Sequence, residues 1–112
     1  MFPHQPPVPA VDAAAVPDGA YLLDVREPDE WQAGHIEGAQ HIPLGELLAR
    51  VAEIRRDRRV HVVCKVGARS AQATQFLNAN GWDAVNVTGG MLAWAAANRP
   101  VTSENGARPG RW

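Results

Sequence analysis

The chain has 112 residues, of which 46% are hydrophobic and 21% are charged, as in one ordinary globular domain. Its formal net charge of −1 gives no reason to expect a nucleic-acid or acidic-membrane partner. No apolar run approaches the roughly 20 residues that span a bilayer, and residues 1–10 lack the apolar core of a signal peptide.

Cys64 is the only cysteine, which excludes an intramolecular disulfide and any zinc site built on several thiolates. We expect a reducing, cytoplasmic setting. We also expect no metal and no cofactor, because the sequence holds no clustered set of Asp, Glu and His ligands. If Cys64 is reactive, only a nucleophile from outside the chain can discharge it.

The first half of the chain predicts short elements. The prolines of residues 1–10 indicate an extended arm, and residues 11–16 indicate a helical turn. Residues 21–25 form a nearly continuous apolar run, typical of a central strand in a parallel sheet. Pro28 and Gly34 mark the ends of a short helix, and His41-Ile42 reads as a second strand.

The second half begins with a helical pattern of apolar residues, for which the stripe is Leu44, Leu47, Leu48, Val51 and Ile54. A strand over residues 60–63 and a helix over residues 71–80 then flank the cysteine. A strand over residues 84–87 and a helix over residues 91–98 follow. We therefore divide the chain into an arm (1–10), a domain (11–100) and a polar tail (101–112).

Strands that alternate with helices at this spacing predict an α/β fold, with a central parallel sheet of four to five short strands and helices on both faces. Ligand sites in such sheets lie outside the carboxyl ends of the strands. Cys64 follows one strand, and the segment containing Asp24 and Arg26 follows another. We expect the two segments to lie side by side.

The chemistry of the chain is concentrated in one loop, whose residues are Cys64, Lys65, Val66, Gly67, Ala68, Arg69 and Ser70. A lone cysteine that ends an apolar strand is also compatible with a small buried hydrophobe. However, Gly67 permits a sharp bend or a close approach to a ligand, and Lys65 and Arg69 bracket the bend with positive charge. Backbone N–H groups and a following helix favour a thiolate, so we interpret Cys64 as a nucleophile.

The sequence resembles the rhodanese family of sulfurtransferases from about residue 11 to about residue 100. The matching pieces, in this order, are residues 22–27, Glu30-Trp31, residues 34–39, Ile42-Pro43, residues 64–70 and residues 89–94. The resemblance implies a rhodanese-like fold. It also implies that Cys64 accepts a sulfane sulfur and carries it as a persulfide, which the backbone N–H groups of the loop cradle.

By the same resemblance, the donor is a small molecule such as thiosulfate or a persulfide. The acceptor is cyanide, a thiol or a partner protein. Asp24 and Arg26 are expected to support the loops through hydrogen bonds, although a direct contact between Arg26 and substrate stays open. An ionised Cys64 needs no general base, so His35 and His41 are interpreted as turn and packing residues, and His61 as a satisfied core histidine.

Two alternatives remain. Phosphatases and arsenate reductases of the same fold place one more residue between cysteine and arginine than the four found here between Cys64 and Arg69. The shorter loop suits a single sulfur atom better than a tetrahedral oxyanion. The other alternative is a non-catalytic rhodanese-like module for binding or regulation; such modules commonly lack the nucleophile, which this chain retains.

Overall fold

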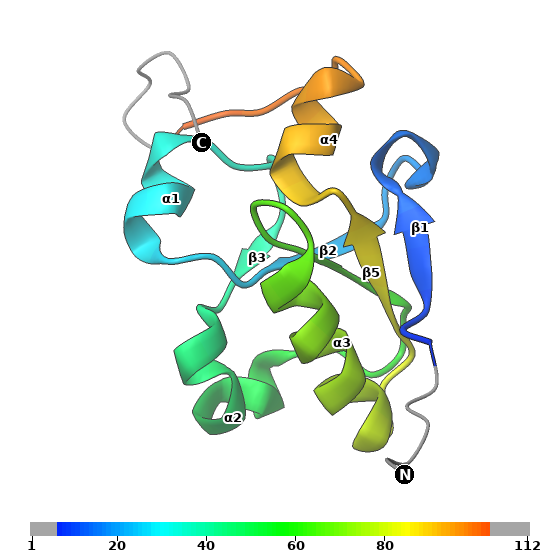
Figure 1. Cartoon of the computed structure of the whole chain (residues 1–112). Coiled ribbons are helices and arrows are strands. Elements are labelled where there is room, and N and C mark those ends of the chain that lie inside the picture. The colour runs from blue at the N-terminus through cyan, green and yellow to red at the C-terminus, as the bar shows by residue number, and fades with distance from the viewer. Residues whose placement is uncertain (1–6, 104–112) are drawn as a thin grey trace, which may run out of the picture.

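The computed structural model of the chain describes residues 7–103. Five parallel strands form one sheet in the order β1-β5-β4-β2-β3 (Figure 1). The strands are β1 (Ala10–Asp12), β2 (Tyr21–Asp24), β3 (Gln40–His41), β4 (Val60–Val63) and β5 (Ala84–Thr88). The α/β fold with a central parallel sheet is therefore confirmed.

Four α-helices connect or follow these strands in the described residues: α1 (Pro28–Ala33), α2 (Leu47–Arg50), α3 (Ala68–Ala79) and α4 (Gly90–Ala96). Successive side chains of a strand point to opposite faces of the sheet, so they pack in two separate hydrophobic cores, one on each face. On β4, Val62 packs in the core that includes Leu47 and Leu77, from α2 and α3. Its neighbour Val63 packs on the other face, in the core that includes Met91 of α4.

The prediction of one continuous amphipathic helix from Leu44 to Ile54 is wrong. The segment consists of a 3-10 turn (Leu44–Glu46), the single turn of α2 and a second 3-10 turn (Val51–Glu53). Because 3-10 turns advance each residue further around the axis than an α-helix does, the apolar stripe breaks, and Leu48 is 74% exposed.

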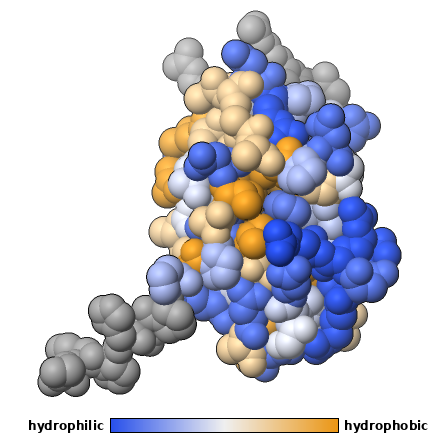
Figure 2. All heavy atoms as spheres, turned by 90° about the vertical axis from the view of Figure 1, so that its right-hand side faces the viewer, coloured by the Kyte–Doolittle hydropathy of each residue, from blue (hydrophilic) through white to orange (hydrophobic). Residues whose placement is uncertain are grey.

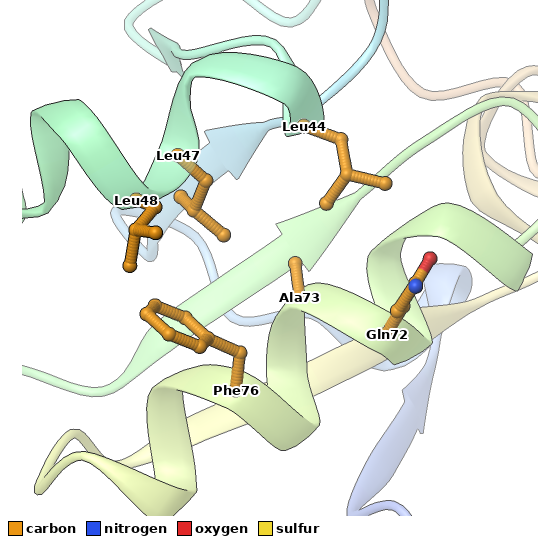
Figure 3. A pocket seen from close by; sticks show the side chains of 6 residues that line it. All are labelled: Leu44, Leu47, Leu48, Gln72, Ala73 and Phe76. Atoms are coloured by element: carbon orange, nitrogen blue, oxygen red, sulfur yellow. The ribbon is translucent and has the colours of Figure 1, made fainter.

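Leu48 lines an apolar groove between α2 and α3 (Figure 3). The groove has a volume of about 270 Å³, and its lining residues are Leu44, Leu47, Leu48, Gln72, Ala73 and Phe76. Figure 3 shows Phe76 directed from α3 toward the leucines of the α2 segment. Of the leucines in this groove, Leu47 is therefore buried in the core, whereas Leu48 stays exposed to solvent.

The beginning of the described chain forms a strand where the sequence indicated only a helical turn. β1 pairs with β5, and the carbonyl of Pro9 accepts a hydrogen bond from Asn86 N–H. The expected turn is confined to the 3-10 segment Ala13–Ala15. Most of the expected arm and tail, residues 1–6 and 104–112, lie outside the described residues.

The surface on the β1 side carries hydrophilic residues over one half and a patch of hydrophobic residues over the other (Figure 2). Within residues 7–103, no helix combines the length and the apolar composition needed to cross a membrane.

Candidate active site

Three chain segments meet at the carboxyl edge of the sheet, where β2, β4 and β5 end. β4 leads directly into the loop 64–70, which we call the Cys64 loop. β4 pairs with β2 on one side and with β5 on the other. The parallel topology therefore places the Cys64 loop between the segment that follows β2 and the Gly89-Gly90 turn that follows β5.

The Cys64 loop folds tightly around the sulfur of Cys64. Gly67 has a φ of 112°, in the left-handed region that favours glycine, and its N–H donates to Cys64 Sγ at 3.1 Å. Ser70, in the first turn of α3, places its hydroxyl oxygen 3.3 Å from the same sulfur. Cys64 and Ser70 are both fully buried.

These contacts make the Cys64 thiol more acidic than an ordinary cysteine. Burial raises the pKa of Cys64, but hydrogen bonds from the Ser70 hydroxyl and from the backbone N–H groups of Ser70, Gly67 and Val66 outweigh it. The pKa of the thiol therefore lies below its usual value. The stabilising groups that act most strongly on the thiolate are neutral dipoles of the loop itself.

The carbonyl groups at the start of the loop are turned toward α4. Met91 N–H donates to the Cys64 carbonyl at 2.8 Å, and Leu92 N–H donates to the Lys65 carbonyl at 3.1 Å. This close approach requires glycine at position 90, where φ is 57° and an added Cβ would lie 2.3 Å from the Cys64 carbonyl oxygen. Because α4 satisfies these carbonyls, the loop can direct its N–H groups toward the sulfur.

Arg69 forms a bidentate ion pair with Glu30 of α1. The two Nη–Oε distances are 2.6 and 2.9 Å. The hydrogen bond from Arg69 lowers the pKa of Glu30 to about 2. The positive charge of Arg69 is thus shared with a carboxylate, whereas Lys65 is half-buried in the loop and Val66 and Ala68 are exposed.

Asp24 and Arg26 form a fully buried ion pair at the end of β2, with an Nη2–Oδ2 distance of 2.7 Å. The guanidinium also donates to the carbonyls of Glu30 and Gly34, at 3.2 and 2.8 Å. Neither side chain has exposed surface. Besides Asp24, the Arg26 guanidinium therefore binds the segment 30–34, which includes Glu30, the ion-pair partner of Arg69.

His35, His41 and His61 contact groups other than the Cys64 sulfur, which accepts hydrogen bonds from Gly67 and Ser70 among the described residues. The ring of Trp31 stacks on His35 and on His41, with centroid separations of 3.6 and 4.7 Å, as expected for packing residues. His61 is buried on β4 as predicted, but its Nδ1 has no hydrogen-bond partner among the described residues. The prediction that the ring nitrogens of His61 all have hydrogen-bond partners is therefore wrong for Nδ1.

Asn86 and Glu30 contact residues of the Cys64 loop, although neither was predicted as a site residue. Asn86 accepts a hydrogen bond from the Ser70 hydroxyl at 2.5 Å and donates to the Gly67 carbonyl at 3.2 Å. A signal existed in its position, because an amide in the middle of a buried apolar strand needs hydrogen-bond partners. Glu30 belongs to a piece that carries the family resemblance, but its ion pair with Arg69 had no signal, since acidic residues are ordinary in a first helical turn.

This site and fold agree with a known family. Residues 10–97 match the family described as Rhodanese-like domain. The chain belongs to the rhodanese family. The resemblance of its motifs to rhodaneses is therefore confirmed.

Curated relatives of this rhodanese include proteins named as sulfurtransferases. The "Sulfurtransferase" of Allochromatium vinosum is 38% identical over 76% of this chain and 80% of its own length. The "Uncharacterized protein YqhL" of Bacillus subtilis is 46% identical over 67% of this chain, which spans 60% of that protein. Similarity at this level supports sulfur transfer in general.

A solved structure is also similar along nearly its whole length. The rhodanese-related protein from Thermoplasma volcanium shares 35% identity, covers 86% of this rhodanese and 99% of its own chain, and superposes with a TM-score of 0.82. The rhodanese-like fold with its parallel sheet is thus confirmed by comparison as well as by topology.

Replacing Glu30 with glutamine should make the unfolding free energy of this rhodanese less dependent on acid pH. Because the pKa of Glu30 is lowered from 4.5 to about 2 in the folded state, its ion pair contributes stability above pH 4.5 and loses it as the pH falls toward 2. We expect a deficit of about 1 kcal/mol at pH 7 that shrinks as the pH falls to 3. Urea unfolding of both proteins across this range measures it, and a constant deficit would contradict the pairing.

Proposed function

We propose that this rhodanese moves sulfane sulfur from an anionic donor such as thiosulfate to a thiophilic acceptor through a persulfide on Cys64. The observation that supports this most directly is the pair of hydrogen bonds from Gly67 N–H and the Ser70 hydroxyl to the Cys64 sulfur. Both favour a thiolate, the nucleophilic form of cysteine.

In the first step, the Cys64 thiolate attacks the outer sulfur of thiosulfate. A bond forms between Sγ and that sulfur, the bond between the two sulfur atoms of thiosulfate breaks, and sulfite leaves with the electron pair. In the second step, cyanide or a thiolate attacks the terminal sulfur of the persulfide. Thiocyanate or a new persulfide leaves, and the Cys64 thiolate is regenerated, which is double-displacement catalysis.

The residues of the Cys64 loop have different roles in the proposed reaction. Val66, Gly67, Ala68 and Ser70 supply a turn whose N–H groups suit the diffuse negative charge of a terminal sulfur. Lys65 and Arg69 attract the anionic donor, with Arg69 held by Glu30. Asp24 and Arg26 act as supporting residues without touching substrate, because the guanidinium already donates to Asp24 and to the carbonyls of Glu30 and Gly34.

Cys64 is itself fully buried, so a donor reaches the sulfur only when the loop opens or the side chain rotates. This limit favours a small donor. The acceptor is external, because the chain has no second cysteine. Among relatives, the Bacillus subtilis protein YrkF is named a putative sulfur carrier protein, which agrees with an acceptor that is itself a protein. We place the reaction in a reducing, cytoplasmic setting.

Intact mass spectrometry after incubation with thiosulfate tests the proposal. The wild-type protein should gain the mass of one sulfur atom and lose it on addition of cyanide, while Cys64→Ser should gain nothing. A wild-type protein that neither gains sulfur nor turns over thiosulfate would favour a binding module. One relative, 40% identical over 71% of this chain, is named an HTH-type transcriptional regulator, and this chain spans 36% of that longer protein. Cys64-dependent hydrolysis of an aryl phosphate would instead favour a phosphatase.

A further inference from the structure

The amide of Asn86 is held in one orientation beside the Cys64 loop. Asn86 is 9% exposed, in the middle of β5. Its Nδ2 donates to the Gly67 carbonyl at 3.2 Å, which leaves Oδ1 facing the Ser70 hydroxyl. Exchanging the two ends of the amide would set Oδ1 against the Gly67 carbonyl oxygen, so the hydrogen bonds favour the observed orientation.

The Ser70 hydroxyl therefore faces two acceptors with a single proton. Its oxygen lies 3.3 Å from Cys64 Sγ and 2.5 Å from Asn86 Oδ1. When the sulfur is a thiolate, a hydroxyl directed at it stabilises the charge. When the sulfur is protonated, the thiol is itself a donor, and the hydroxyl is free to donate to Asn86. Ionisation of Cys64 thus draws the Ser70 proton away from Asn86.

We infer that Asn86 is a positioning residue that competes with the Cys64 sulfur for the Ser70 hydroxyl proton, and so favours the states of Cys64 in which Sγ carries no charge. The protonated thiol is one such state. The persulfide is another, because its charge sits on the terminal sulfur; this second part rests on the proposed function. Asn86 then makes the free thiol less acidic than the loop alone would, and it assists the departure of charge from Sγ during sulfur loading.

Other charged groups near Cys64 also influence the ionisation of its thiol. Lys65 lies on the loop and Arg69 at the start of α3. Glu30 of α1 pairs with Arg69, and Glu27, the residue before α1, also acts on Arg69. The Asp24–Arg26 pair lies where the neighbouring β2 ends. β5 and α4, which also pack against the loop, carry no titratable side chain between residues 84 and 96. The substitutions below leave all of these charges in place, so they isolate the hydroxyl and the amide.

Alkylation of Cys64 by iodoacetamide, measured as a function of pH, reports the thiol's midpoint directly. Asn86→Ala should lower this midpoint by about one pH unit, because sulfur becomes the sole acceptor for the hydroxyl. Ser70→Ala should raise it. In the Ser70→Ala background, Asn86→Ala should have no further effect. The two residues then show the coupling expected of a shared proton.

A role for Asn86 as a simple anchor of the loop predicts the opposite result. Loss of the hydrogen bond to the Gly67 carbonyl would then raise the midpoint, with or without Ser70, and this outcome overturns the inference. If Asn86→Ala does not fold, Asn86→Val serves in its place, since a β-branched residue suits a buried strand. In the wild-type protein, the side-chain amide NMR signals of Asn86 should also titrate with the alkylation midpoint; unchanged signals would contradict the shared proton.

These measurements need no sulfur donor. A protein that takes up no sulfur from thiosulfate, yet shows the expected midpoints, loses the proposed function and keeps the competition between Asn86 and Cys64. A protein that takes up sulfur, yet shows the anchor result, keeps the function and loses this inference.

Discussion

The Arg26→Met variant should lose about 3–5 kcal/mol of unfolding free energy at neutral pH, a large share of the roughly 5–15 kcal/mol that stabilises a small domain. The substitution leaves Asp24 buried without its ion-pair partner. It also removes the donors to the carbonyls of Glu30 and Gly34. Guanidinium unfolding followed by circular dichroism measures the loss.

Arg55→Met provides a matched control, because it makes the same chemical change at an exposed ion pair. Arg55 and its partner Asp57 have side chains that are 54% and 67% exposed. Such pairs contribute about 0–1 kcal/mol, so the control should unfold close to the wild type. Equal losses in the two variants would mean that burial of the Asp24–Arg26 pair does not determine its importance.

Gly90→Ala should destabilise the protein by about 2–4 kcal/mol and also disturb the Cys64 loop. A Cβ at position 90 would lie 2.3 Å from the Cys64 carbonyl oxygen and 2.6 Å from that of Lys65. The backbone must therefore move apart at the point where Met91 and Leu92 donate to these carbonyls. Chemical denaturation gives the stability, and iodoacetamide alkylation at several pH values gives the acidity of Cys64, which should fall toward that of an ordinary thiol.

Gly38→Ala separates backbone strain from this collision. Gly38 also has a positive φ, of 84°, but nothing lies within 4 Å of the Cβ position. It should cost only the roughly 1 kcal/mol of a left-handed alanine and leave the alkylation profile unchanged. If Gly90→Ala behaves in the same way, contact between α4 and the loop carbonyls has no influence on the thiol.

The parallel sheet could be predicted because its central strands are short apolar runs bounded by turns, as at residues 60–63. The position of Cys64 followed from the same pattern, since a residue after a strand must lie at the carboxyl edge of the sheet. The family resemblance added the order of the motifs. These features depend on neighbours in the sequence, which a single chain displays directly.

The partners within the site could not be predicted, because they are distant in sequence. Arg69 pairs with Glu30, and Ser70 pairs with Asn86, only after the sheet has brought their elements together. β1 was missed for a similar reason: residues 10–12 are too short a pattern by themselves, and pairing with β5 decides their conformation. The broken helix around α2 shows that apolar spacing alone does not distinguish an α-turn from 3-10 turns.

The dependence of the Cys64 loop on α4 also has a consequence for the order of events during synthesis. Residues 64–70 leave the ribosome before Met91 and Leu92, whose N–H groups donate to the Cys64 and Lys65 carbonyls. Without these two hydrogen bonds we expect the loop not to hold its N–H groups against the sulfur, and Cys64 to be less acidic than in the folded domain. We therefore expect the reactivity of Cys64 to appear late in synthesis, after the segment that carries α4 has folded against the loop.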